Sequence, residues 1–291
     1  MTEQLIDFRY IFAVILAFAV TALSGPLMIP VLRRLKVGNT ERKELQSHQK
    51  KTGTPTMGGL MFLLAIIVTS LFFIPDYPKI VPILFVTVAF GVIGFFDDYL
   101  KVVLKRSDGL LAWQKMLLEI LVTAVFAVWL YRFSDIPLTM LVPFSGGRYA
   151  DFGFLALPIM FLAVIGTVNG ANFTDGLDGL ASSVTVLIAT FFSVVAVGTD
   201  SGIEPSTCAV VGALLGFLLF NVYPASVFMG DTGSLALGGF VASAAYMMQM
   251  PMFILIVGLI YWIEILSVMI QVSYFKITHG KRIFRMAPIH H

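Results

Sequence analysis

Charge is scarce in this sequence. Of its 291 residues, 12% are charged and 58% are hydrophobic, whereas an ordinary soluble domain has roughly 25% charged residues. The mean hydropathy is +0.92. So little charge cannot cover a water-facing surface, which argues against a soluble enzyme and a disordered chain. The composition therefore predicts an integral membrane protein with several spans.

Cysteine is also nearly absent. The single cysteine, Cys208, lies in an apolar run, so neither a disulfide framework nor a cysteine metal site is available. The net charge is only +2, from 19 basic and 17 acidic residues. We expect a lipid bilayer around this chain and no nucleic acid partner.

Long apolar runs take the place of charge. We expect nine transmembrane helices, at residues 10–32, 57–74, 80–96, 110–131, 154–168, 180–197, 208–222, 234–250 and 252–275. The runs are continuous, unlike the alternating segments of about ten residues in a membrane β-barrel. The first run lacks a basic front and a small-residue cleavage site, so we expect a retained span. The predicted fold is all-α, a polytopic helical bundle in one transmembrane domain over residues 1–291.

The basic residues sort by side when the chain crosses nine times. One set of connections holds 15 of the 19 basic residues: Arg33, Arg34, Lys36, Arg42, Lys43, Lys50, Lys51, Lys101, Lys105, Arg106, Lys115, Lys276, Lys281, Arg282 and Arg285. Because cytoplasmic loops carry the excess of lysine and arginine, this set is predicted to be cytoplasmic and the N-terminus to lie outside.

Five aspartates fall at the predicted cytoplasmic ends of the spans: Asp97, Asp98, Asp175, Asp178 and Asp231. Any one of them alone is most simply a solvated residue at a helix boundary. Five together, beside glycine, asparagine and lysine, indicate a site.

Asp97 and Asp98 are adjacent, and two ionised carboxylates at a membrane boundary are costly unless cations compensate them. Lys101 and Lys105 would follow one and two turns later if the helix continues. A charge-balanced helix end is the plain interpretation. A site for a divalent metal or a phosphate is the functional one, because oxygen ligands suit Mg²⁺ and lysines suit phosphate.

Two further segments carry polar residues at regular spacing. Asn169, Asn172, Asp175 and Asp178 are each three apart, so a helical turn would place them on one face, although glycines nearby also suit a capped turn. Glycines flank Asp231 and would let backbone amides approach an anion.

Residues near Asp231 add two expectations. Thr232 or Ser234 could cap the eighth helix. Phe228 offers a face on which a nucleotide base could stack, or it could simply anchor the helix in the membrane.

Two acids fall inside apolar runs. Glu119 follows Lys115 by one turn, which predicts a local ion pair. Glu264 has no basic residue within a turn and must find a partner on another helix. The C-terminal pair, His290 and His291, could also be the start of a purification tag.

The motifs together carry a family resemblance. They are Ser47-His48 with Lys51, then residues 53–59, 97–99, 172–180, 228–235 and 282–291, in that order over nearly the whole chain. The sequence resembles the phospho-N-acetylmuramoyl-pentapeptide transferases, within the polyprenyl-phosphate sugar-1-phosphate transferases. Such enzymes move phospho-MurNAc-pentapeptide from UDP-MurNAc-pentapeptide to undecaprenyl phosphate with Mg²⁺, releasing UMP and making lipid I at the cytoplasmic face of the bacterial membrane.

The resemblance implies roles for particular residues. It implies that Asp97, Asp98 and Asp231 form the acidic centre, with Asp231 the metal ligand. Our hypothesis is that Asp97 or Asp98 deprotonates the acceptor or supports the metal, and both direct attack and a two-step route through a phospho-enzyme aspartate are open. The residues implied to bind substrate are Lys51, Thr56, Lys101, Lys105, Asn169, Asn172, Asp175, Asp178, Asn221, Phe228, His290 and His291. The histidine pair matches the start of a family motif, which argues against a tag.

Several points stay open at the level of sequence. The family pattern continues past the histidine pair to a tenth span, which this sequence does not contain. A related UDP-GlcNAc transferase is one alternative, and a homodimer is allowed but not specified. A transporter is another, although it would place acids near the bilayer midplane in paired repeats, whereas most acids here cluster at one face.

Overall fold

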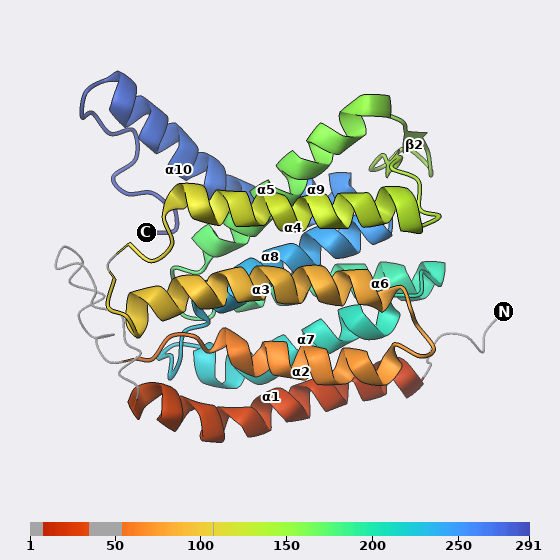
Figure 1. The fold of residues 1–291 in the computed structure, drawn as a ribbon, viewed down its shortest axis with the longest axis horizontal. Coiled ribbons are helices and arrows are strands. Elements are labelled where there is room, and N and C mark those ends of the chain that lie inside the picture. Colours follow the sequence, from red (N-terminus) through yellow and green to blue (C-terminus); the bar gives the residue numbers. More distant parts are fainter. Residues whose placement is uncertain (1–7, 35–53, 107) are drawn as a thin grey trace.

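Helices make up nearly all the regular structure of the computed structural model, which describes residues 8–34, 54–106 and 108–291 (Figure 1). The main helices are α1 (Phe8–Arg34), α2 (Gly59–Phe73), α3 (Ile80–Val102), α4 (Ala112–Phe133), α5 (Ala156–Thr174), α6 (Leu180–Thr199), α7 (Glu204–Asn221), α8 (Gly230–Met247) and α10 (Leu259–Ile277). The shorter elements are β1 (Met140–Leu141), β2 (Tyr149–Ala150), η2 (Gly153–Leu155), η3 (Pro251–Phe253) and α9 (Ile254–Val257).

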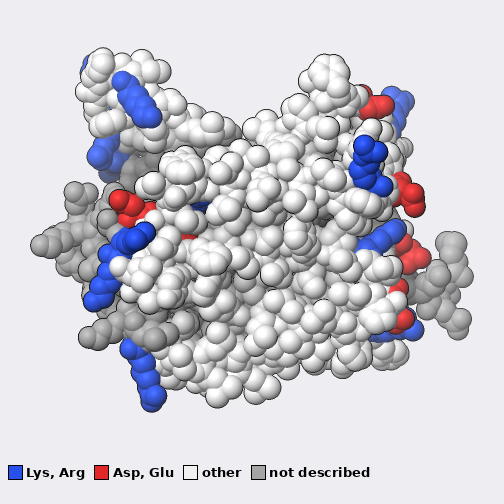
Figure 2. All heavy atoms as spheres, in the orientation of Figure 1, with Lys and Arg blue, Asp and Glu red and all other residues white. Residues whose placement is uncertain are grey.

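The bundle has the dimensions and surface of a membrane protein. Within the described residues, seven helical segments are long and apolar enough to cross a membrane: α1, α3, α4, η2 with α5, α6, α7 and α10. Helix α2 is apolar but has only 15 residues. Figure 2 shows lysine, arginine and acidic side chains gathered at the two ends of the bundle, with an uncharged belt between them. The prediction of a polytopic helical membrane protein is confirmed.

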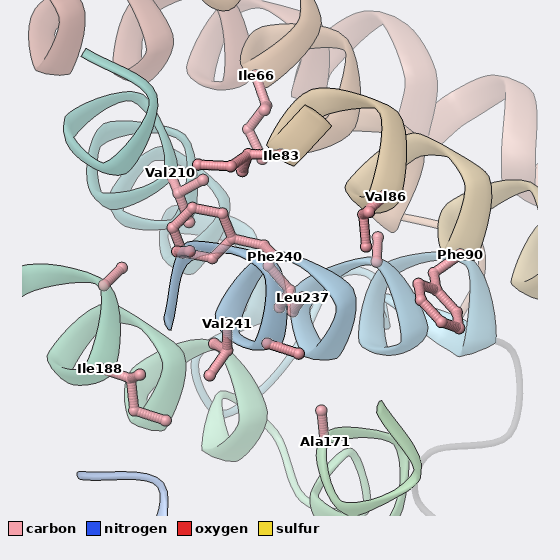
Figure 3. Close-up of a cluster of buried hydrophobic side chains, with 14 of the residues drawn as sticks. Ile66, Ile83, Val86, Phe90, Ala171, Ile188, Val210, Leu237, Phe240 and Val241 are labelled. Carbon is pink, nitrogen blue, oxygen red and sulfur yellow. The ribbon is translucent and has the colours of Figure 1, made fainter. Parts of the chain in front are cut away.

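Helix α8 forms the centre of the bundle. All its residues from Thr232 to Met247 are buried, and it packs most extensively against α3 and α5. Its sequence is rich in glycine, alanine and serine, and such small residues let helix backbones approach closely inside a membrane protein. Figure 3 shows Leu237, Phe240 and Val241 of α8 among side chains of the surrounding helices, with Val86 and Phe90 of α3 farther along the same helix.

Several helix ends differ from the sequence expectation. Helices α3 and α5 each extend six residues beyond the predicted ends at 96 and 168. The predicted span at 252–275 is wrong as a single helix, because the chain forms η3 and α9 before α10 begins. Pro251 starts the 3₁₀ turn, and Gly258 lies outside helical geometry (φ −99°, ψ 22°), where it ends α9 and precedes α10.

Candidate active site

Lys101 joins two of the predicted catalytic aspartates. Because α3 continues past residue 96, Lys101 follows Asp97 by one helical turn, and its Nζ lies 2.6 Å from Oδ2 of Asp97. The same Nζ lies 3.1 Å from Oδ2 of Asp231 at the start of α8. The backbone N–H of Leu110 also donates to Oδ1 of Asp97 at 2.7 Å. Asp97, Lys101 and Asp231 thus form one charged cluster at one end of the bundle, although Asp97 and Asp231 are 134 positions apart in the sequence.

Asp231 is the centre of this cluster. The Nζ of Lys115 lies 3.3 Å from its Oδ2, and Nδ2 of Asn172 donates to its Oδ1 at 2.8 Å. Asn172 also donates to the hydroxyl of Ser234, one turn along α8, at 2.8 Å. The Asp231 side chain is 19% exposed, against 3% for Asp97. Of these two carboxylates, Asp231 is the more accessible to a ligand from solution.

Sequence reasoning missed Lys115. The expectation was a local ion pair with Glu119, yet its ammonium contacts Asp231 and Asn172, and Glu119 accepts instead from Nδ2 of Asn169 at 2.7 Å. The signal available was that Lys115 belongs to the same predicted membrane face as the aspartates. Helical spacing alone favoured the wrong partner, because the contact that matters joins α4 to α8.

Asp98 has a different environment from Asp97. It accepts from the backbone N–H of Asp231 at 3.2 Å, from the N–H of Thr232 at 2.9 Å and from the Thr232 hydroxyl at 2.6 Å. No side chain from the residues at the start of α8 caps this helix, so the prediction that Thr232 or Ser234 caps it is wrong. A carboxylate from α3 satisfies the free N–H groups there and complements the positive end of the helix dipole.

The segment at residues 55–59 rests against the start of α8. The N–H of Phe228 donates to the carbonyl of Pro55 at 2.8 Å, and the N–H of Gly58 donates to the carbonyl of Phe228 at 2.8 Å. A Cβ at Gly230 would lie 2.6 Å from both Oγ1 of Thr56 and Oδ2 of Asp98. Thr56 is therefore brought to the aspartate cluster, buried at 6% exposure.

The predicted nucleotide residues lie on α5 and the turn after it. Asn169 and Asn172 share one face of α5, whereas Asp175 and Asp178 lie in the turn at residues 175–179, beyond the helix. Oδ2 of Asp178 accepts from the N–H of Ala225 at 3.0 Å, which places this turn against the loop between α7 and α8.

Asn221 holds the loop between α7 and α8 through hydrogen bonds. Its Nδ2 donates to the carbonyl of Val227 at 3.0 Å, and its Oδ1 accepts from the hydroxyl of Ser182 at 2.8 Å. Both ends of its amide are therefore engaged by the protein, and Asn221 is buried at 2% exposure. Phe228 follows in the same loop and is partly exposed.

The remaining predicted residues are not all brought to the cluster. Lys105 lies beyond the end of α3, exposed and with a left-handed backbone (φ 53°), so the expectation that the helix carries it one turn beyond Lys101 is wrong. Lys51 lies outside the described residues. His290 and His291 lie against each other, with ring centroids 4.1 Å apart, and His290 contacts Glu264 of α10.

Whether a metal ion fits this site depends on the carboxylate oxygens of the aspartate cluster. Across residues 8–34, 54–106 and 108–291, no three histidine, cysteine or acidic side chains are grouped as a metal site. Mg²⁺ does not require such a cage, because one or two carboxylates with water and substrate phosphates commonly hold it. Asp231, whose Oδ2 lies 3.1 Å and 3.3 Å from the ammonium groups of Lys101 and Lys115, is a suitable oxygen donor for that arrangement.

Comparison with known proteins identifies the class first. The family described as glycosyl transferase family 4 matches residues 80–249, more than half of the chain, so this is a membrane glycosyl transferase. Residues 51–63 match the phospho-N-acetylmuramoyl-pentapeptide-transferase signature 1.

Individual relatives identify the family. Phospho-N-acetylmuramoyl-pentapeptide-transferase of Acetivibrio thermocellus is 50% identical over 97% of this chain and 86% of its own length. The proteins of the same name from Caldicellulosiruptor bescii and Clostridium novyi are each 46% identical, over 99% and 97% of this chain and 89% and 87% of their own lengths. The chain belongs to the phospho-N-acetylmuramoyl-pentapeptide transferase family.

Proposed function

We propose that this protein transfers phospho-MurNAc-pentapeptide from UDP-MurNAc-pentapeptide to undecaprenyl phosphate, forming lipid I and releasing UMP for peptidoglycan synthesis. The observation that carries the proposal is the cluster of aspartates and lysines at one end of a membrane bundle. As a member of its family, it is a multi-pass membrane enzyme that uses a nucleotide sugar and a lipid carrier. We place it in the bacterial cytoplasmic membrane, with the cluster on the cytoplasmic side.

The reaction brings two phosphate groups together. An oxygen of the lipid phosphate forms a bond to the phosphorus next to the sugar, and the bond from that phosphorus to the bridging oxygen breaks, so the bridging oxygen leaves with UMP. Charge neutralisation and positioning supply most of the catalysis in such transfers. Lys101 suits this task, because its side chain is 37% exposed and can exchange a carboxylate contact for a phosphate contact.

Asp231 is the residue we propose to hold Mg²⁺, and enzymes of this family depend on a metal. When bound, the ion supplies neutralising charge on the donor phosphates. The accessible carboxylate of Asp231, and the contact that Lys101 makes with both Asp231 and Asp97, support this assignment.

Asp97 is the residue we propose as the base for the lipid phosphate. Asp98 is the weaker candidate, because three donors from the first turn of α8 already occupy its oxygens. We also propose direct transfer without a phospho-enzyme: Lys101 and Lys115 reduce the nucleophilicity of Asp231, and Asp97 becomes free to act as the base when Lys101 exchanges its carboxylate contact for the phosphate. Rapid quenching with labelled donor tests this step, and labelled phosphate trapped on the protein would overturn it.

Residues on α5 and the turn after it are proposed to hold the nucleotide. Asn169, Asn172, Asp175 and Asp178 would meet the uridine diphosphate, with Phe228 against the uracil ring and Thr56 near the phosphates. The structural support is that the turn at 175–179 lies against the loop that leads to Asp231.

Lys51, Lys105, His290 and His291 complete the proposed substrate-binding set, and Asn221 supports it by holding the loop that leads to Phe228 and Asp231. Release of UMP tests the whole proposal: purified protein with Mg²⁺, undecaprenyl phosphate and UDP-MurNAc-pentapeptide should release UMP and form a lipid-linked product. UDP-GlcNAc in place of the donor should give none. If UMP were released with UDP-GlcNAc and not with UDP-MurNAc-pentapeptide, the proposed donor would be wrong.

A further inference from the structure

Glu264 and His290 form a buried contact away from the aspartate cluster. Glu264 lies on α10, and His290 lies in the segment that follows this helix. Nδ1 of His290 is 3.2 Å from Oε2 of Glu264, and the two side chains are 6% and 5% exposed. An acid inside an apolar helix needs a partner elsewhere in the fold, and His290 is the partner of Glu264.

The contact determines which ring atom of His290 carries a proton. Nδ1 and the carboxylate oxygen are within ion-pair distance, although they are not aligned as a linear hydrogen bond. Two atoms that both present lone pairs would repel at this distance in a buried setting, so a proton lies on Nδ1. Nδ1 then carries its proton in both charge states of the ring, and Nε2 remains for another partner.

Nε2 faces the turn after α5. A Cβ at Gly176 would overlap Nε2 of His290, so this edge of the ring lies directly over the glycine. Nε2 is buried and has no hydrogen-bond partner within the described part of the chain. Buried polar atoms without partners are rare in native structures, so Nε2 is available to a ligand that binds at this turn. Gly176 lies between Asp175 and Asp178, the turn proposed to hold the nucleotide.

A second side chain of α10 holds the same segment in another way. Oε1 of Gln271 accepts from the backbone N–H groups of Ile283 and Phe284, at 3.1 Å and 2.9 Å. Gln271 therefore fixes the backbone after α10, whereas Glu264 contacts the imidazole itself. This difference supplies a matched control.

We propose that Glu264 is a positioning residue for donor binding: it holds Nδ1 of His290, so that Nε2 meets the uridine diphosphate group at the turn around Gly176. The proposal rests on the proposed function, because the ligand of that turn is assigned there. A carboxylate behind an imidazole is a common way for proteins to fix the tautomer and orientation of the ring.

Nitrogen-15 NMR of histidine-labelled protein in detergent tests the tautomer. The chain has four histidines, and the His290 signals are assigned by their loss in His290→Gln. Above the titration range of imidazole, His290 should carry its proton on Nδ1 in the parent protein. In Glu264→Leu it should change to a mixture of tautomers. A mixture in the parent protein, or no change in the variant, would overturn the proposal.

Calorimetric titration with UDP tests the consequence for binding. Glu264→Leu and His290→Gln should each weaken UDP binding about 10- to 100-fold, and the double variant should be no weaker than His290→Gln alone. Leucine removes the buried carboxylate and leaves an imidazole that can be neutral, so no uncompensated charge remains and the variant is expected to fold. Gln271→Leu should change binding less than threefold. Additive losses from Glu264→Leu and His290→Gln would contradict the proposal.

Gly176→Ala supplies an independent variant. Its new methyl group would meet the ring of His290, so Gly176→Ala should weaken UDP binding in the parent protein and cause no further loss once His290 has been replaced by alanine. The two proposals fail separately in these experiments. Binding and tautomer results as expected, without UMP release by the parent protein, would refute the transferase assignment alone. Normal UMP release with unchanged UDP binding in Glu264→Leu would refute only the role of Glu264.

Discussion

The carboxylate of Asp98 on α3 caps helix α8 through Thr232. Its Oδ2 accepts both the backbone N–H of Thr232, at 2.9 Å, and the hydroxyl of the same residue, at 2.6 Å. The adjacent Asp97 instead contacts Lys101 and the N–H of Leu110. Two neighbouring carboxylates therefore have different tasks, one in the attachment of α8 and one in the charged cluster.

Asp98→Ala is expected to lower the stability of the protein. Removal of the carboxylate leaves the N–H and hydroxyl of Thr232 buried without an acceptor, at a cost of about 1–3 kcal/mol for each unsatisfied group. The midpoint of thermal unfolding in detergent should fall by several degrees. Asp98→Asn should fall less, because the amide oxygen still accepts. A melting midpoint unchanged in Asp98→Ala would contradict the capping role.

Lys115→Met is expected to lower kcat/KM for the nucleotide donor about 100-fold, a typical loss when one charged group that stabilises a transition state is removed. Its ammonium lies 3.3 Å from Asp231, so the variant leaves that carboxylate with one cation fewer. Lys276→Met removes an exposed lysine from the last turn of α10 and should have nearly full activity. Equal effects of the two variants would show that only net charge matters.

Asp231→Asn is expected to abolish UMP release and to weaken binding of Mn²⁺, used as a spectroscopic substitute for Mg²⁺. Asparagine preserves the size of the side chain, so the fold should persist. Asp200→Asn is the matched control, because Asp200 ends α6 with a left-handed backbone (φ 50°) that asparagine also adopts. Normal Mn²⁺ binding by Asp231→Asn would exclude Asp231 as the ligand.

Gly94→Ala is expected to disrupt the contact between α3 and α8. A Cβ at Gly94 would overlap the backbone carbonyl of Asp231, which cannot move without shifting α8. Thermal stability and activity should both fall. Gly198→Ala, in the last turns of α6, meets nothing within 4 Å and should be neutral or stabilising by up to about 1 kcal/mol. Equal melting midpoints for the two variants would contradict the close approach.

Local spacing and composition predicted the features that depend on one helix. The contact between Asp97 and Lys101 follows from a spacing of four residues on a continuous helix, and hydropathy located the apolar helices. Lys105 was misplaced because the end of α3 depends on the turn that follows, where no periodic signal exists. Gly258 interrupts the last apolar run although its hydropathy is continuous.

Contacts between helices could not be read from the sequence. Lys115 reaches Asp231 and not Glu119 because α4 packs against α3 and α5, an arrangement set by packing of side chains over the whole bundle. The capping of α8 by Asp98 is of the same kind, since a cap is normally sought within a few residues of the helix it serves.

The burial of α8 also has a consequence for how the protein is made. This helix carries Asp231, yet its glycine- and serine-rich sequence is not among the segments apolar enough to cross a membrane by themselves. Insertion from the translocation machinery depends on the hydrophobicity of each segment. We therefore expect α8 to enter the bilayer only with the help of α3 and α5, so that a partly assembled chain has no reactive centre.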